Sequence, residues 1–450
     1  MKVLYEDNHI IVVEKPVNVP VQGDETGDLS LLDEVKAYIK EKYSKPGEVF
    51  IGLVHRLDRP VGGVMVFART SKAASRLAPQ FAEKDHSGAV KKYAAVVTGE
   101  PPASASLEDW LIRDEESHSS IVVPEDTGNA KKAGLGFKRT ARRKGASLLD
   151  VDLKTGRHHQ IRVQLANAGY PIWGDQRYNK AAVPGQQIAL FAYSLSFEHP
   201  VTHERMRFTS IPRYGAFGEF GDELKLMAAD VDFSYIDNDI VVLNKPSGMT
   251  VAKKDGGDDN LEARLDAVFP GVSPVHRLDA VTTGLVIFAR NDKAKAALDR
   301  AIRERTIKKY YRLIIKGAPA VKTGTIRLWA QRTETESFVR VYDDKKPGAA
   351  EMITDYRVIK TEGGISLVEA LLVTGRTHQL RASFAHIGYP ILGDDKYGSR
   401  DFNRDPEYRK LHRKNPLCLA AVRIEFDFPK GSYLERLNGL TVEKEAPFSI

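Results

Sequence analysis

Cysteine is almost absent from this chain of 450 residues, in which Cys418 is the only one. A single cysteine excludes an internal disulfide and any metal site built from several cysteines, and a reducing compartment is its simplest setting. The sequence also lacks any run approaching the roughly 18 apolar residues of a membrane-spanning helix. Acidic residues stand within Met1–Asp7, where a secretory signal would have its apolar core. We therefore expect a cytoplasmic protein.

Two common catalytic signatures are missing as well. The sequence has no glycine-rich phosphate loop ending in Gly-Lys-Ser or Gly-Lys-Thr, and no His-Glu-x-x-His helix. His158 and His159 are adjacent, and adjacent side chains on a helix point in different directions, so we do not expect them to share a metal ion. These absences remove the phosphate-loop and zinc-protease classes.

The length and composition fit a globular protein of more than one domain. A hydrophobic content of 42% is ordinary for a folded chain, and 450 residues are too many for one core. The net charge of +7 permits a polyanionic partner without requiring one.

An internal repeat of about 220 residues organises the sequence. His-Arg-Leu-Asp occurs twice, ending at Asp58 and at Asp279, and each copy precedes an apolar run ending in Phe-Ala-Arg. A strand-turn-strand pattern around an Asp-Asn turn starts each half, and a capped helix follows the apolar run. A repeat this long indicates a duplicated domain and not a solenoid. Gly215, Gly218 and Gly221 predict a short, loose linker between the copies, so we expect two contacting domains in a monomer.

Three further landmarks recur in the same order. Each half has a basic-aromatic strand start, at Lys91-Lys92-Tyr93 and Lys308-Lys309-Tyr310, then Thr-Gly-Arg-x-His-Gln-Ile/Leu-Arg ending at Arg162 and Arg381. Each half therefore offers one aspartate, one tyrosine and one arginine. An arginine beside the aspartate would lower the pKa of the carboxyl group and orient it through a two-pronged hydrogen bond. Such a carboxylate is a usable nucleophile, and a tyrosine offers a stacking face and a proton.

Each landmark also has an ordinary structural explanation. An aspartate after a strand-leading loop is usually a turn residue, lysines on a strand often lie along its edge, and a helical arginine commonly forms a surface ion pair. We interpret His55 and His276 as hydrogen-bonding neighbours of the site and not as bases. The functional interpretation is favoured because all three landmarks recur together. A glycosidase would need two converging carboxylates, whereas each half repeats only one.

The ordered set, with a later Gly-Asp-x-x-Tyr, resembles the RluA-type family of RNA pseudouridine synthases. The resemblance covers nearly the whole chain and implies an α+β fold, a mixed, largely antiparallel sheet with flanking helices, duplicated in tandem. It implies one pseudouridine-synthase-like domain over residues 1–222 and a second over 230–450. The family isomerises uridine in structured RNA and needs no metal or organic cofactor.

The resemblance also implies a role for each matching residue. Asp58 and Asp279 match the nucleophile, which attacks the uridine so that its base detaches, rotates and rejoins through carbon 5. The tyrosines, Tyr93 and Tyr310, would pack on the base and relay the carbon-5 proton. The arginines of the third landmark, Arg162 and Arg381, match the partner of the aspartate, and those of the first, Arg56 and Arg277, match a residue that helps to displace the base.

Two alternatives stay open on the sequence alone. One half could be catalytic while the other is a non-catalytic RNA-binding module, or the chain could be purely structural. The first half has Gly62 where the family more often has serine or threonine, and the second has Ala280 after its aspartate, but neither departure touches the proposed site residues. We expect RNA as the partner, with basic stretches such as Lys131–Lys144 following the phosphates. Ribosomal and transfer RNA are equally compatible with the sequence.

Overall fold

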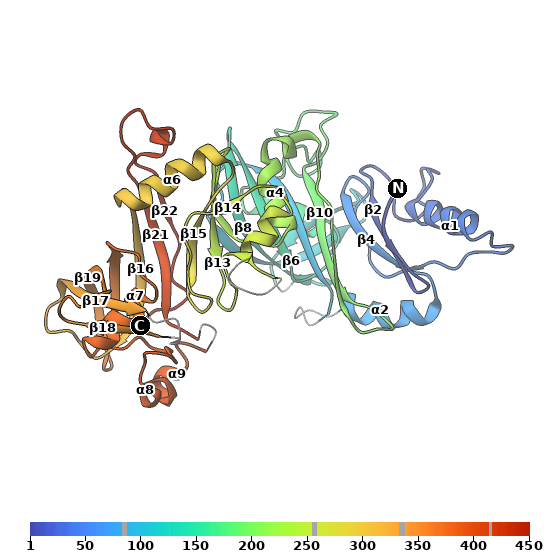
Figure 1. Ribbon diagram of the computed structural model, residues 1–450. Helices are drawn as coiled ribbons and strands as arrows, with labels where there is room; N and C mark the ends of the chain where they lie inside the picture. The colour runs from blue at the N-terminus through green and yellow to red at the C-terminus, as the bar shows by residue number, and fades with distance from the viewer. Residues whose placement is uncertain (83–87, 126, 254–258, 333–337, 414–415) are drawn as a thin grey trace. The chain divides into compact units, whose positions relative to one another are not determined.

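The computed structural model of the protein describes residues 1–82, 88–125, 127–253, 259–332, 338–413 and 416–450 (Figure 1). The chain divides into two compact units, Met1–Ala228 and Ala229–Ile450. Within the described residues each unit builds one 11-stranded sheet with helices packed on it, so the predicted α+β class and tandem duplication are confirmed. No helix in these ranges is long and apolar enough to cross a membrane.

The elements of the first unit follow the predicted order. Its strands are β1 (Lys2–Glu6), β2 (Ile10–Lys15), β3 (Gly52–Leu53), β4 (Gly62–Ala68), β5 (Val90–Thr98), β6 (Ser104–Asp114), β7 (Ser119–Val123), β8 (Lys131–Arg143), β9 (Ala146–Leu153), β10 (Leu190–Glu198) and β11 (Arg205–Thr209). Its helices are α1 (Leu31–Lys42), α2 (Ser71–Ala82), α3 (Gln160–Asn167), the 3₁₀ helix η1 (Gly215–Phe220) and α4 (Gly221–Ala228).

The second unit repeats this series. Its strands are β12 (Phe233–Ile236), β13 (Ile240–Lys245), β14 (Ser273–Pro274), β15 (Thr283–Ala289), β16 (Ile307–Lys316), β17 (Thr323–Arg332), β18 (Val339–Tyr342), β19 (Ala350–Glu362), β20 (Ile365–Leu372), β21 (Leu419–Phe426) and β22 (Thr441–Glu443). Its helices are α5 (Leu261–Asp266), α6 (Asp292–Glu304), α7 (Gln379–His386), α8 (Arg400–Arg404), α9 (Pro406–Arg409) and the 3₁₀ helix η3 (Glu435–Leu437).

The two sheets have the same strand order. The first runs β1-β2-β4-β10-β5-β9-β8-β6-β7 and the second β12-β13-β15-β21-β16-β20-β19-β17-β18. Among the strand pairs of the described residues, β4 with β10 and β15 with β21 are parallel, and the others are antiparallel. The sheet is therefore mixed and largely antiparallel, as the sequence predicts.

The turn between β1 and β2 and the start of helix α2 are stabilised by the side chains that the sequence predicts. The carboxylate of Asp7 accepts hydrogen bonds from the backbone N–H groups of His9 and Ile10, at 2.7 and 2.8 Å, which stabilises the turn between β1 and β2. The Thr70 hydroxyl accepts from the N–H of Ala73 at 3.1 Å and caps α2. In the second unit the side chain of Asn291 caps α6 in the same way.

One apolar face of each sheet packs against a helix. In Figure 1, α2 lies beside β4 and β10, and the corresponding helix α6 packs on β15. Equivalent side chains fill both cores. The first core contains Ile10, Val12, Val64, Val66, Ala73, Leu77 and Phe197, and the second contains Ile240, Val242, Leu285, Ile287, Ala294, Leu298 and Phe426. Because these positions correspond one to one, the repeat preserves the packing that supports each site.

Glycine is required where the parallel strands meet. Gly63 has a φ of +135°, and a Cβ atom there would lie 2.3 Å from the carbonyl oxygen of Ala192. Gly284 has a φ of +109°, and its Cβ atom would lie 2.1 Å from the oxygen of Ala421. Any side chain would push these strands apart, just after the loop that carries the motif aspartate.

The prediction of a loose linker between the two copies is wrong. Residues 215–228 are helical, because Phe217, Phe220 and Leu224 are buried against the first unit. The first unit therefore continues beyond residue 222.

Candidate active site

The motif aspartates lie on tight turns at the start of a central strand. The carbonyl oxygen of Asp58 accepts the N–H of Val61 at 3.0 Å, just before β4, and Asp279 and Thr282 repeat this bond before β15. The side chain of Asp58 is 28% exposed and that of Asp279 is 24% exposed. Each carboxylate is thus fixed by its backbone but open to a ligand.

A buried lysine supports each of these turns. The ammonium group of Lys15 donates to the carbonyl oxygens of Pro16, Arg59 and Val61 at 2.8–3.0 Å. Lys245 donates to Pro246, Met249 and Ala280, each at 2.8 Å. Burial lowers the pKa of Lys15 to about 7 and that of Lys245 to about 8. Each lysine therefore connects the end of a core strand to the residue directly after the motif aspartate.

The arginine on the short helix faces each aspartate, as predicted. Nη1 of Arg162 donates to Oδ2 of Asp58 at 3.4 Å, and Nη1 of Arg381 donates to Oδ2 of Asp279 at 3.1 Å. These arginines lie on α3 and α7. The structure thus brings the first and third landmarks together in both units.

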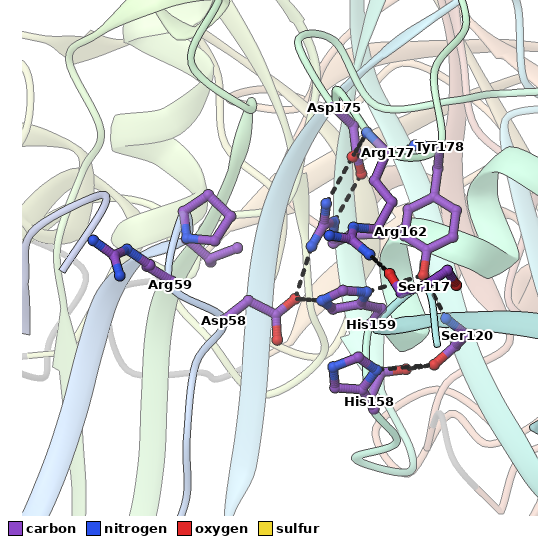
Figure 2. Close-up of polar contacts among 12 residues, drawn as sticks. Asp58, Arg59, Ser117, Ser120, His158, His159, Arg162, Asp175, Arg177 and Tyr178 are labelled. Carbon is purple, nitrogen blue, oxygen red and sulfur yellow. Dashed lines mark hydrogen bonds and ion pairs between the residues drawn. The ribbon is translucent and has the colours of Figure 1, made fainter. Parts of the chain in front are cut away.

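The two-pronged hydrogen bond has a different partner from the one expected. Nε and Nη2 of Arg162 donate to the two carboxylate oxygens of Asp175, each at 2.8 Å (Figure 2). Arg381 binds Asp394 in the same way in the second unit. Burial would lower the pKa of Arg162, but the hydrogen bonds and charge of Asp175 raise it. The prediction that Asp58 and Asp279 receive the two-pronged bond is wrong, because the fully buried carboxylate occupies that side of the guanidinium.

A histidine approaches the same oxygen of each motif aspartate as the arginine does. Nε2 of His159 lies 3.7 Å from Oδ2 of Asp58, and Nε2 of His378 lies 3.7 Å from Oδ2 of Asp279. Burial lowers the pKa of His159 to about 2, and it also lowers the pKa of His378. His159 and His378 therefore face the carboxylates as neutral imidazoles.

The adjacent histidines do not point apart as expected. The rings of His158 and His159 are stacked with their centroids 3.8 Å apart. Both residues precede α3, and His159 has a φ of +52°, so the spacing rule for a helix does not apply to them.

The structure places the predicted tyrosine in the cleft in the first unit but not in the second. Tyr93 is buried and lines the same cleft as Asp58. In the second unit Tyr311 lines the cleft with Asp279, whereas the hydroxyl of Tyr310 donates to Glu425 at 3.1 Å and its ring stacks on Arg423. Successive strand residues point to opposite faces, so a displacement of one residue moves the side chain out of the cleft.

The histidine and the arginine of the His-Arg-Leu-Asp motif differ in their exposure to solvent. Nε2 of His55 accepts the N–H of Val66 at 3.1 Å, and His276 accepts that of Ile287 at 3.2 Å. Burial lowers the pKa of His55 to about 3, which fits the predicted hydrogen-bonding role. Arg56 and Arg277 are exposed and line the two clefts. They can therefore contact a ligand as it enters.

Each site opens into a cleft large enough for a nucleotide. The cleft volumes are about 920 Å³ in the first unit and about 950 Å³ in the second. Basic side chains outnumber acidic ones in both linings. In the first they are Arg56, Arg59, Lys91, Arg113, Lys154, Arg157 and Arg162, and in the second Arg277, Arg303, Arg305, Lys308, Lys309, Arg332, Arg376, Arg381 and Lys396. Such a lining favours an anionic ligand.

The basic stretch around β8 is less available than expected. Lys132 forms an ion pair with Glu108 at 2.9 Å, Arg142 pairs with Glu100, and Arg143 pairs with Glu223. These cations are already neutralised by neighbouring acids.

Sequence reasoning missed several residues that build the site. They are the lysines Lys15 and Lys245, the buried aspartates Asp175 and Asp394, the histidines His159 and His378, and the tyrosines Tyr178 and Tyr397. These eight residues form four pairs at equivalent positions of the two halves, and this repetition in the sequence could have identified them.

Comparison with known proteins gives one family. A family model described as RNA pseudouridylate synthase matches the chain over residues 9–167 and again over residues 239–386. The two segments together make up more than half of the chain. Each segment contains the motif aspartate, the cleft tyrosine and the arginine of its own unit.

Individual relatives match about one half of the chain. Ribosomal large subunit pseudouridine synthase D of Zymomonas mobilis subsp. mobilis is 31% identical over 221 residues, which are 46% of this chain and 68% of that protein. Ribosomal large subunit pseudouridine synthase C of Vibrio vulnificus is 36% identical over 200 residues, 43% of this chain and 61% of that protein. Among solved structures, Human RNA Pseudouridylate Synthase Domain Containing 4 is 22% identical with a TM-score of 0.41, covering 49% of this chain and 92% of that chain.

Proposed function

This chain belongs to the RNA pseudouridylate synthase family of isomerases, and from that premise we propose that each of its units carries a competent site for converting uridine to pseudouridine. The observation that carries the proposal is the duplicated constellation itself. Arg162 faces Asp58 at 3.4 Å and Arg381 faces Asp279 at 3.1 Å, on clefts of similar volume. A unit that only bound RNA would need a basic surface and not this arrangement.

Asp58 and Asp279 act as the nucleophiles. Each carboxylate is about one quarter exposed, held at its base by a turn and approached on Oδ2 by the arginine. Oδ1 is the oxygen left for the substrate. It forms a bond to the ribose carbon that carries the base as the bond from that carbon to N1 breaks, and the base then rotates and rejoins through carbon 5 as the carboxylate leaves. The guanidinium stabilises the carboxylate when it leaves again.

Tyr93 and Tyr311 lie beneath the position of the base. Burial raises the pKa of both phenols, and the nearby aspartate raises it further, so each is a neutral hydroxyl. The ring offers a stacking face, and the hydroxyl can relay the proton that carbon 5 releases.

The substrate is a uridine in structured RNA, and ribosomal RNA is the first choice because two of the similar proteins are named as ribosomal large subunit enzymes. The base must leave the RNA stack to reach the aspartate, which costs a few kcal/mol. Arg56 and Arg277, exposed at the clefts, are placed to fill the space it leaves. A loop uridine is favoured because its base is already partly unstacked.

Mapping of pseudouridines tests this proposal. RNA from a strain lacking the protein should lose specific pseudouridines that return with the wild-type chain. An Asp58→Ala, Asp279→Ala double variant should restore none of them, and a double variant that restores all of them would falsify the proposal. The single variants show how the units divide the work. If one single variant loses every pseudouridine that depends on the protein and the other single variant loses none, the alternative with one catalytic unit is favoured.

A further inference from the structure

One histidine side chain lies between the motif aspartate and a half-buried tyrosine in each unit. Nδ1 of His159 lies 2.9 Å from the hydroxyl of Tyr178, while its Nε2 lies 3.7 Å from Oδ2 of Asp58 (Figure 2). In the second unit Nδ1 of His378 lies 2.8 Å from the hydroxyl of Tyr397, and its Nε2 lies 3.7 Å from Asp279. The preceding residues differ, His158 against Thr377, so the arrangement does not depend on them.

The tyrosine determines which nitrogen of the imidazole carries the proton. The hydroxyl oxygen of Tyr178 accepts the backbone N–H of Ser120 at 2.7 Å, and that of Tyr397 accepts the N–H of Val339 at 2.8 Å. The backbone N–H can only donate, and among the hydrogen-bond contacts of the described residues Nδ1 is the acceptor within reach of the phenol proton, so we assign the O–H as the donor to Nδ1. Nδ1 then accepts, and the ring proton sits on Nε2, which faces the aspartate.

The backbone at these histidines is unusual. His159 has a φ of +52° and His378 a φ of +54°, in the left-handed region that asparagine or glycine adopts more easily. Asparagine tolerates this conformation, so it is a substitution that shortens the side chain without straining the backbone.

We propose that His159 and His378 are positioning residues whose Nε2–H donates to Oδ2 of the nucleophilic aspartate, so that Oδ1 is the oxygen that attacks. The inference rests on the proposed function and adds a residue to it. Arg162 or Arg381 approaches the same oxygen, so Oδ2 has two donors. At 3.7 Å the contact is long, and it tightens when RNA displaces water from the cleft. The imidazole keeps its proton throughout and is a donor and not a base.

The surroundings of each imidazole oppose its protonation. Asp58, Arg113, His158, Arg162, Arg177 and Tyr178 surround His159. Asp279, Arg381, Asp394, Lys396 and Tyr397 surround His378. Burial and the arginines outweigh the carboxylates, and the phenol proton blocks Nδ1.

Two substitutions of His378 distinguish the effect of its N–H donor from the effect of the positive φ at this position. The test uses the Asp58→Ala chain, in which only the second unit can react. His378→Gln keeps an N–H near the place of Nε2, whereas His378→Asn suits the positive φ but is too short to reach Asp279. We expect kcat to fall less than about tenfold for Gln and on the order of 100-fold for Asn, with KM for RNA unchanged in both. An Asn variant as active as the Gln variant would overturn the inference.

A double-mutant cycle provides a second readout that a merely structural role would not move. Tyr397→Phe removes the phenol proton that Nδ1 accepts, so the ring proton is no longer held on Nε2, and kcat should fall on the order of tenfold with KM for RNA unchanged. In the His378→Gln chain the same Tyr397→Phe substitution should change kcat less than about twofold. A Tyr397→Phe variant as active as its parent, or equal losses in the two chains, would overturn the inference. A wild-type chain that makes no pseudouridine would overturn the proposed function itself and this inference with it.

Discussion

Asp175 holds the guanidinium of Arg162 by two parallel hydrogen bonds of 2.8 Å, and it does so from a fully buried position. Asp58, the proposed nucleophile, receives only the remaining Nη1 of that arginine, at 3.4 Å. One carboxylate therefore neutralises and orients the arginine, while the other remains available for chemistry. Asp394, Arg381 and Asp279 repeat this division.

The two aspartates on one arginine should respond differently to the same substitution. Asp175→Asn leaves Arg162 charged and buried without its partner, so the free energy of unfolding should fall by roughly 3–5 kcal/mol. Asp58→Asn should change it by less than about 0.5 kcal/mol, because this carboxylate is partly exposed. Urea unfolding of the two variants measures the difference. Equal losses of stability would contradict the division of roles.

The neighbouring tyrosines of β16 provide a matched pair. In the Asp58→Ala chain, Tyr311→Phe should lower the rate of pseudouridine formation by roughly 100-fold, because it removes the cleft hydroxyl but keeps the ring. Tyr310→Phe should change the rate less than about twofold, since this hydroxyl binds Glu425 outside the cleft. Single-turnover assays on one RNA distinguish them. A larger effect at Tyr310 would reverse our assignment.

The buried lysines should be essential for stability. Lys245→Met preserves the aliphatic length but leaves the carbonyl oxygens of Pro246, Met249 and Ala280 without their donor. We expect the free energy of unfolding to fall by about 2–4 kcal/mol. Lys253→Met is the control, since Lys253 is exposed and forms only a surface ion pair. Comparable melting temperatures for the two variants would refute the supporting role.

Buried imidazoles should make stability depend on pH. Burial lowers the pKa of His55 to about 3, below the value of about 6.5 in an unfolded chain. Between these values the unfolded chain binds a proton that the folded chain does not. The contribution is therefore fully present above about pH 6.5 and is lost as the pH falls, by up to about 1.4 kcal/mol per pH unit. His55→Gln should flatten the slope of unfolding free energy against pH below about 6.5, and an unchanged slope would exclude His55 as its source.

Binding of RNA should depend on salt through the rim of the second cleft. Arg303 in the last turn of α6 and Arg305 at its C-cap both line that cleft. The measurement uses the Asp58→Ala, Asp279→Ala chain, so that RNA binds without reacting. Adding Arg303→Gln and Arg305→Gln to it should reduce the slope of log affinity against log salt concentration by about 1 to 2. Arg300→Gln on the same helix is the control, because Arg300 is paired with Glu304. A control with the same reduced slope would show that the helix as a whole, and not the rim, contacts RNA.

The sequence was sufficient for the architecture and for half of the site. The Asp-Asn turns, the helix caps and the apolar runs depend on local chemistry, and the structure has them where the pattern predicts. The pairing of Asp58 with Arg162 was accessible because both landmarks recur in order.

The errors arise where the outcome depends on tertiary structure. Lys308-Lys309-Tyr310 repeats the letters of Lys91-Lys92-Tyr93, but the strand places Tyr311 in the cleft, and letters alone do not reveal a displacement of one residue. Asp58 and Asp175 have the same side chain, and only burial decides which takes the two-pronged bond. Lys15 ends an apolar strand, where a lysine is usually at the surface, and its three carbonyl partners come from separate segments.

One inner strand of each sheet is synthesised late in its unit. β10 joins β4 to β5, although about 90 residues separate its start from the end of β5 in the chain. A nascent polypeptide that ends before Leu190 contains β4 and β5 but lacks the strand that pairs with both of them. Premature termination in that interval would release an inactive fragment with unpaired strand edges, a natural substrate for proteolytic clearance.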